Sequence, residues 1–187
     1  AAALFEERLV LPFRSVRTHC PDCQAPLQVY KTQDRTVQTL HLGGFTAHET
    51  LLQCGRCPNP TVYGAPELYR LVPSGCTLGY DVLVAVGKAL FLRDQRAEEI
   101  VAELSTHHVR LSPSEVGYLG KKFVVYLALA HRQAAPRLQA ALRAQGGYIL
   151  HLDGTCEGGG PMLMSSLDSL SEIVLGSVKI PSERQEW

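Results

Sequence analysis

The stretch YILHLDGT, residues 148–155, places a lone aspartate after a mostly apolar run and directly before a glycine. Alternate residues of a strand share one face, so His151 and Asp153 point the same way. A carboxylate at a strand end is a common metal-binding or acid/base position. It is equally a common way to end a strand, with Gly154 letting the chain turn, so both interpretations remain open at this point.

Two further strand-like runs follow, PMLMSSL at 161–167 and EIVLGSVKI at 172–180. Together they predict a three-stranded antiparallel meander over residues 147–187, with Glu157 in its first turn. Three strands without covering helices leave an open edge and an apolar face. Such a sheet is expected to dock on the preceding helices, to form a homodimer or to aggregate. The expected apolar positions are Met162, Met164, Ile173 and Val178.

The preceding segment, residues 81–146, has the periodicity of helices. Helices are predicted over Asp81–Arg93, Arg96–Ser105 and Pro136–Ala144, with another beginning near Pro113. That helix opens with a capping box, because Ser112 can cap it, Pro113 suits the first turn and Glu115 follows three residues after the serine. Its apolar stripe comprises Val116, Leu119, Phe123, Val124 and Leu127.

Two helices joined by the short connection THHVRL, residues 106–111, are typical of a helix-turn-helix, although plain helical bundles share this pattern. In the helix-turn-helix interpretation, the second helix enters the DNA major groove with its N-terminal half. Lysines neutralise phosphates, and serine or tyrosine hydroxyls donate to phosphates or base edges. The outward residues predicted there are Ser114, Glu115, Tyr118, Lys121 and Lys122, with Arg110 reaching the backbone from just before the helix.

The first segment, residues 1–80, is rich in turn residues and short strand-like runs, and it carries two Cys-x-x-Cys pairs. Two such pairs supply the ligands of a tetrahedral structural Zn²⁺, and an inserted hairpin would explain the long gap between them. The alternative is four buried or redox-active thiols. The predicted zinc ligands are Cys20, Cys23, Cys54 and Cys57. Cys76 and Cys156 are expected to be small buried residues.

Composition restricts the class and the compartment. The chain has 187 residues with balanced charge, but residues 81–146 carry 9 basic and 6 acidic side chains, whereas residues 147–187 carry 2 and 6. A mildly basic middle suits phosphate contact. No apolar run is long enough for a membrane span, and the start has no signal-peptide pattern. Paired cysteines favour metal binding in a reducing cytosol, so a cytoplasmic location is expected.

These motifs in this order resemble a known family. The run from EEIVAEL through LSPSEVGYLGKKFVVYL to the LHLDGT strand resembles the N-terminal half of a bacterial insertion-sequence transposase of the DDE class. The resemblance implies an α+β chain in three parts: a zinc-binding β module over 1–80, a helix-turn-helix block over 81–146, and the first strands of an RNase-H-like domain over 147–187. It implies double-stranded DNA at the element ends as partner.

The resemblance also implies a mechanism. Such enzymes hold two Mg²⁺ ions with three carboxylates, one ion activating the nucleophile and the other stabilising the leaving oxygen. Asp153 matches the first carboxylate, with His151 as a candidate supporting residue. The second Asp and the final Glu lie further along in that family, and Asp168 and Glu172 come too early to replace them. This chain is therefore expected to bind DNA without cutting it.

Two alternatives stay open from the residues alone. One is a non-enzymatic zinc-containing transcription regulator, which would share the zinc module and the helix pair. The other is a scaffold that contacts proteins through its exposed sheet, which would have no salt-dependent affinity for DNA.

Overall fold

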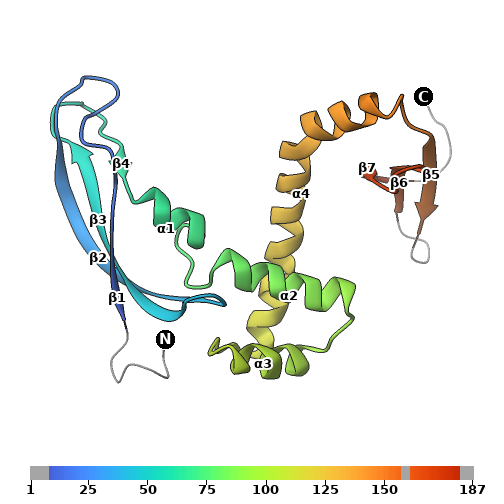
Figure 1. Cartoon of the computed structure of the whole chain (residues 1–187), viewed down its shortest axis with the longest axis horizontal. Helices are drawn as coiled ribbons and strands as arrows, with labels where there is room; N and C mark the ends of the chain where they lie inside the picture. Colours follow the sequence, from blue (N-terminus) through green and yellow to red (C-terminus); the bar gives the residue numbers. More distant parts are fainter. Residues whose placement is uncertain (1–8, 157–160, 182–187) are drawn as a thin grey trace. The chain divides into compact units, whose positions relative to one another are not determined.

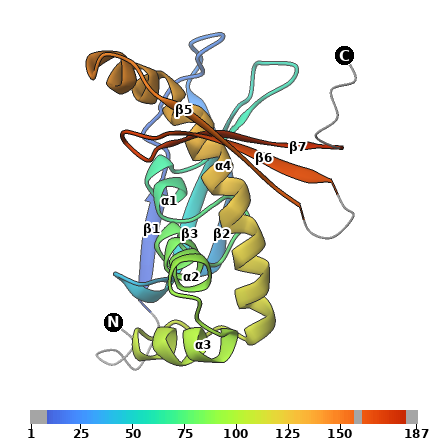
Figure 2. The same ribbon diagram turned by 90° about the vertical axis from the view of Figure 1, so that its right-hand side faces the viewer.

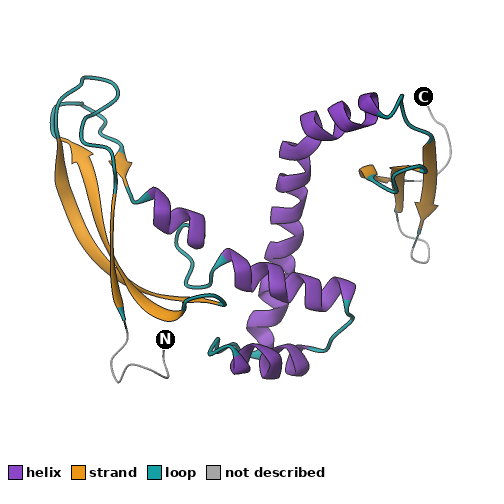
Figure 3. Ribbon diagram, in the orientation of Figure 1, coloured by secondary structure: helices purple, strands orange, loops and turns teal. Residues whose placement is uncertain are grey.

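The computed structural model describes residues 9–156 and 161–181. It is a mixed α+β structure with two sheets and four helices, and the chain passes from strands to helices and back to strands (Figure 3). Contacts divide it into two compact units, residues 1–128 and 129–187. The division falls inside a helix, whereas the three predicted segments follow composition and break near residues 80 and 146.

The first sheet is built around a long hairpin. Strands β2 (Leu27–Thr39) and β3 (Gly43–Cys54) pair antiparallel, and β1 (Val10–Arg14) pairs parallel to β3 on its other side. Figure 2 shows β3 between β1 and β2. The short β4 (Val62–Tyr63) also pairs with β3. The predicted hairpin between the cysteine pairs is thus confirmed, and it is longer than the separate runs that the sequence suggested.

The hairpin is longer than expected because its middle is polar. Residues 31–36, KTQDRT, lack the apolar alternation of a half-buried strand, yet they continue the ladder opposite β3. Helix α1 (Pro66–Leu71) packs with the turn end of the hairpin in a small core. The buried members of this core are Val37, Phe45, Ala47, Ala65, Leu68 and Val72.

Three helical segments share a second core in the same unit. Helices α2 (Tyr80–Leu92) and α3 (Ala97–Thr106) pack with the first turns of α4 (Pro113–Ala144), as labelled in Figure 1. Gly87 of α2 lies against the Phe123 ring, where any side chain would collide with the ring. The buried members are Val82, Leu83, Val86, Ala89, Ile100, Leu104, Val109, Leu111, Val116 and Leu119.

Helix α4 is one element of 32 residues, so the prediction of a separate helix at Pro136–Ala144 is wrong. Proline removes one helical hydrogen bond and usually ends or kinks a helix, but Pro136 lies inside α4. The predicted apolar stripe is only partly buried. Val116 and Leu119 lie in the core and Phe123 packs against it, whereas Val124 and Leu127 are half exposed, at 50% and 55%.

The second sheet is the predicted antiparallel meander. Strands β5 (Leu150–Thr155), β6 (Met162–Asp168) and β7 (Val174–Ile180) pair in that order. Asp153 was expected at the strand end, but β5 continues through Gly154 to Thr155, opposite Met164 and Leu163. The ladder to β6 provides pairing partners beyond Asp153, which the local sequence could not indicate. Glu157 lies outside the described residues.

Asp168 holds the end of this meander together. Its side chain is fully buried and accepts hydrogen bonds from the Ser171 hydroxyl (2.6 Å), the Ile149 amide (2.9 Å) and the Gln145 amide group (2.9 Å). The backbone amides of Leu170 and Ser171 donate as well. These donors, the Ser171 hydroxyl first, hold the pKa of the Asp168 carboxyl well below its usual range.

We expect Asp168→Asn to destabilise the meander, because an amide keeps one acceptor and turns a donor toward other donors. Hydrogen exchange of the amides in residues 148–181 should accelerate on the order of tenfold. Asp153→Asn is the matched control, because the same change is made at an exposed position of the same sheet.

The pH dependence has a defined sign. The pKa of Asp168 in the folded state lies below the unfolded value of about 3.9. The carboxylate therefore contributes fully to the free energy of unfolding above about pH 3.9, and this contribution is lost as the pH falls from there toward the folded-state pKa. Exchange of the meander should therefore show an additional acid-induced acceleration in the wild type that Asp168→Asn lacks. Equal acid profiles for the two proteins would contradict this role of the carboxylate.

Candidate metal centre and nucleic-acid interface

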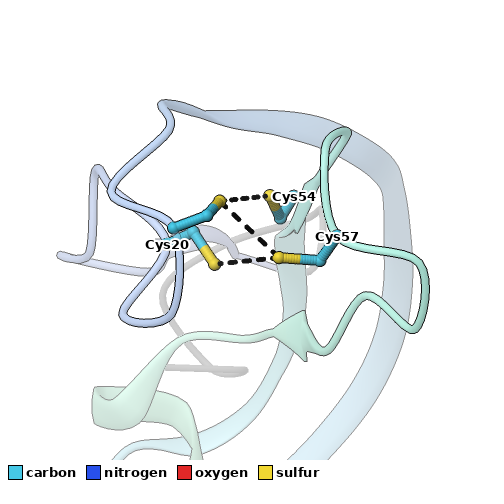
Figure 4. A group of neighbouring side chains, drawn as sticks. Cys20, Cys54 and Cys57 are labelled. Carbon is cyan, nitrogen blue, oxygen red and sulfur yellow. Dashed lines mark hydrogen bonds between the residues drawn. The ribbon is translucent and has the colours of Figure 1, made fainter.

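The paired cysteines converge on one point. Their sulfur atoms all lie within 4.8 Å of one another, and this is the only group of three or more His, Cys, Asp or Glu side chains within residues 9–156 and 161–181 that could hold a metal. Figure 4 shows the sulfurs of Cys20, Cys54 and Cys57 directed at one another. The closest pairs are Cys23–Cys54 at 3.5 Å, Cys23–Cys57 at 3.6 Å and Cys20–Cys57 at 3.8 Å.

These separations fit a tetrahedral ion. Four sulfurs placed about 2.3 Å from a metal stand about 3.8 Å apart along each edge of the tetrahedron. The observed separations of 3.5–3.8 Å are close to that value. All donors are sulfur, which selects soft and borderline ions over Mg²⁺. The group can therefore hold a thiolate-bound divalent metal in a closed site.

Local backbone geometry places the first pair. The Cys20 amide donates to the Ala25 carbonyl, and the Gln24 amide donates to the Cys20 carbonyl, which folds residues 20–25 into a tight knuckle. Gln24 takes a left-handed conformation with φ 57° to close it. The second pair begins with Cys54, the last residue of β3, which lies opposite Leu27, the first residue of β2. The hairpin therefore returns the chain to the point where the knuckle lies.

The electrostatics of the cluster favour a bound cation. Backbone amides of Arg56 and Cys57 donate to the Cys54 sulfur and lower its pKa to about 6. The Cys57 pKa is raised instead, because its thiol hydrogen bonds with Cys23 and then with Cys54 and Cys20. Ionised thiols around one point repel one another, so they do not all ionise at once, and a bound divalent ion offsets this repulsion.

The other candidate ligands lie elsewhere. His48 bonds to Asp34 at 2.6 Å, and His19 bonds to the neighbouring Thr18 hydroxyl. Neither histidine belongs to the cysteine group. Cys76 and Cys156 are also outside it, but neither is buried as expected, since Cys76 is partly exposed and Cys156 is exposed.

The N-terminal half of α4 presents part of the predicted DNA-facing set. Ser114, Tyr118 and Lys121 are exposed, and Arg110 is exposed just before the helix. Spacings of three, four and seven residues put the three helical positions on one side of α4. The buried Val116 and Leu119 hold the other side of the helix on the core. All four side chains are exposed, although the Ser114 hydroxyl hydrogen bonds with the Ser112 hydroxyl at 3.0 Å and Lys122 lies over the Tyr118 ring at 4.9 Å.

The other two predicted contacts are engaged inside the protein. Glu115 accepts from the Ser112 amide at 2.7 Å and hydroxyl at 2.8 Å, while the Glu115 amide donates to the Ser112 hydroxyl at 3.3 Å. This is the predicted capping box. Lys122 lies over the Tyr118 ring at 4.9 Å and donates to the Cys76 sulfur at 3.2 Å. The Cys76 contact joins residues 46 apart in sequence, and no local pattern indicated it.

Asp153 is exposed on β5 and lies opposite Ser165, which hydrogen bonds to Ser177 on the next strand at 3.0 Å. His151 is also exposed and shares its face. The neighbours across the sheet are therefore hydroxyls and not carboxylates. Within the described part of the chain, Asp153 belongs to no group of ligands that could hold a metal.

Comparison with family models, with curated proteins and with solved structures finds no match to this chain. The functional assignment therefore rests on the residues and their geometry. In the described residues no helix combines the length and the apolar character needed to cross a membrane.

We expect the chain to bind one tetrahedral divalent ion. Titration with Co²⁺, a spectroscopic substitute for Zn²⁺, should give thiolate charge-transfer absorption that saturates at about one ion per chain. Cys54→Ser should abolish this saturation, because a closed four-sulfur site loses one ligand. Cys76→Ser, outside the cluster, is the matched control and should titrate like the wild type. Full binding by Cys54→Ser would exclude the proposed ligand set.

Proposed function

We propose that this chain is the DNA-binding N-terminal portion of a DDE-type transposase, carrying a structural Zn²⁺ and reading DNA with α4. One observation carries the DNA-binding part of the proposal. Ser114, Tyr118 and Lys121 stand exposed on one side of a capped helix whose other side is fixed to a buried core. A rigid helix with a free polar and basic face is the element that enters a major groove.

The sequence around this helix supports the same proposal. Arg110 lies in the connection to α3, where a guanidinium can reach a phosphate beside the groove. Its backbone amide donates to Gln38 at 2.9 Å, so the connection is tied to the hairpin. Lys122 and Glu115 are assigned to positioning, because Lys122 contacts Tyr118 and Glu115 caps the helix.

We assign the metal a structural role. All four donors are sulfur, which leaves no open position for water or substrate. The ion would join the 20–25 knuckle to the end of β3, and a core of Cys20, Ala25 and Cys54 lies beside it. In this role Zn²⁺ fixes the open end of the hairpin and takes no part in chemistry.

The transposase part of the proposal is supported by the meander with Asp153 on its first strand, which matches how an RNase-H-like domain begins. The residues around Asp153 do not suit two Mg²⁺ ions, since its cross-strand neighbours Ser165 and Ser177 are neutral. We therefore assign this chain DNA binding without strand cleavage.

A second candidate is a non-enzymatic zinc-containing transcription regulator. It is favoured by one observation, that the only metal-capable group in the described residues is the structural type with four cysteines. The two candidates share the DNA-binding helix and differ in the DNA they prefer. A transposase prefers the ends of its element, whereas a regulator prefers promoter sites.

We expect Lys121→Ala to weaken DNA binding and to reduce the slope of log affinity against log salt by about 0.9, the loss of one phosphate contact. Lys88→Ala is the matched control, because Lys88 is an exposed lysine on α2, outside the proposed interface. Fluorescence anisotropy with duplex DNA over a salt series measures both. Equal salt slopes for the two variants would mean that Lys121 makes no phosphate contact and that the DNA binds at another surface.

We also expect no Mg²⁺-dependent nicking of supercoiled DNA by the purified 187-residue chain, because one carboxylate cannot hold two metals. Agarose gel assays with Mg²⁺ and Mn²⁺ test this. Nicking that disappears on Asp153→Ala would show that the chain completes its own active site, and would overturn the assignment of DNA binding alone.

A further inference from the structure

Gly117 lies inside helix α4 at a position where no neighbouring side chain requires a glycine. Helix interiors disfavour glycine, because its backbone loses more conformational freedom than that of any other residue. The other glycine of this helix, Gly120, has a packing reason, since a side chain there would collide with Leu90 of α2. A side chain built at Gly117 meets no atom of the described residues within 4 Å. The glycine therefore leaves open space at the surface of the helix.

This space belongs to a hollow of about 520 Å³ between the C-terminal end of α2 and the N-terminal half of α4, called here the α2–α4 hollow. Phe91 forms an apolar wall, because it stacks on Phe123 with ring centroids 6.0 Å apart and is still 56% exposed. Lys121 is the only charged residue of the lining. The lining residues are Leu90, Phe91, Gly117, Gly120, Lys121 and Val124.

The α2–α4 hollow is continuous with the proposed DNA-binding face. Gly117 comes three residues after Ser114 and four before Lys121, so the three residues follow one another along one side of α4. Lys121 belongs both to this face and to the lining of the hollow. When the face enters a major groove, a backbone strand of the duplex passes beside the helix. The hollow lies where such a strand would pass.

We propose that the α2–α4 hollow seats a deoxyribose–phosphate segment of one DNA strand, and that Gly117 is the positioning residue that lets this strand approach the helix backbone. The phosphate lies at Lys121, whose ammonium group supplies the complementary charge. The deoxyribose carbons pack against the Phe91 ring. Contacts of this kind position a protein on the duplex and carry no sequence information. This inference rests on the proposed DNA-binding function and adds the contact that sets the depth of α4.

The test is fluorescence anisotropy of the Zn²⁺-loaded 187-residue chain with two duplexes of unrelated sequence over a salt series. Gly117→Leu fills the hollow and should weaken binding to both duplexes on the order of tenfold. The slope of log affinity against log salt should fall by about 0.9, although no charge is removed, because the phosphate no longer reaches Lys121. Ala128→Leu is the matched control, since it adds a leucine at another exposed position of α4, about 16 Å further along.

Further measurements separate a lost contact from a lost fold. Leucine is a better helix former than glycine, so Gly117→Leu should raise the melting temperature by roughly 2–4 °C while the DNA affinity falls. In the double variant G117L/K121A the salt slope should fall no further than in either single variant, because both changes remove the same phosphate contact. Phe91→Ala should weaken binding without changing the slope, because it removes an apolar wall and no charge.

The outcomes distinguish this inference from the proposed function. If Lys121→Ala weakens binding and Gly117→Leu binds like the wild type, the DNA-binding function stands, but the hollow belongs to a partner other than DNA and the inference is wrong. A wild type without salt-dependent DNA affinity would overturn both. If Gly117→Leu melts below the wild type, Gly117→Ala decides, because it adds a single methyl group. Unchanged DNA affinity of that variant would then overturn the inference.

Discussion

The β2–β3 ladder is the constraint on which the first unit depends. At one end it places Cys54 opposite Leu27, beside the 20–25 knuckle, and so brings the two cysteine pairs together. At the other end the Gln38 amide donates to the Thr77 carbonyl, and the Gly79 amide donates to the Gln38 carbonyl. The same hairpin therefore positions the sulfur cluster and the start of α2.

Helix α4 has an exposed polar face because other residues of the same helix make the contacts with the core, the helix cap and the neighbouring segments. Val116 and Leu119 are buried, Glu115 is used by the cap, and Lys122 is held by Tyr118 and Cys76. Ser114, Tyr118 and Lys121 stay exposed on this face, although Ser114 also hydrogen bonds with Ser112 and Tyr118 contacts Lys122. Because this face is exposed, a ligand can bind to it without breaking the contacts that stabilise the folded helix.

Sequence patterns predicted the features that short-range chemistry determines. The cysteine spacing, the Ser112–Glu115 cap and the order of the meander strands are all local. Pattern reasoning failed where distant residues decide: the Pro136 region stays within α4, and Val124 and Leu127 are exposed. Asp168 also accepts hydrogen bonds from the distant Gln145 and Ile149, which the local sequence did not indicate. The residues of the proposed DNA interface were predicted from the local helix pattern. The structure adds that Glu115 and Lys122 already make contacts within the protein.

The parallel pairing of β1 with β3 has a consequence for the order of folding. Val10 pairs with Thr46, and the whole of β2 lies between them in sequence, whereas Thr39 and Gly43 meet across a short turn. Closing a short loop costs less chain entropy than closing a long one. We therefore expect the hairpin to form first from its turn end and β1 to join it later. In this order β1 pairs with a hairpin that has already formed. Until it does, the edge of β3 that pairs with β1 stays open to other strands.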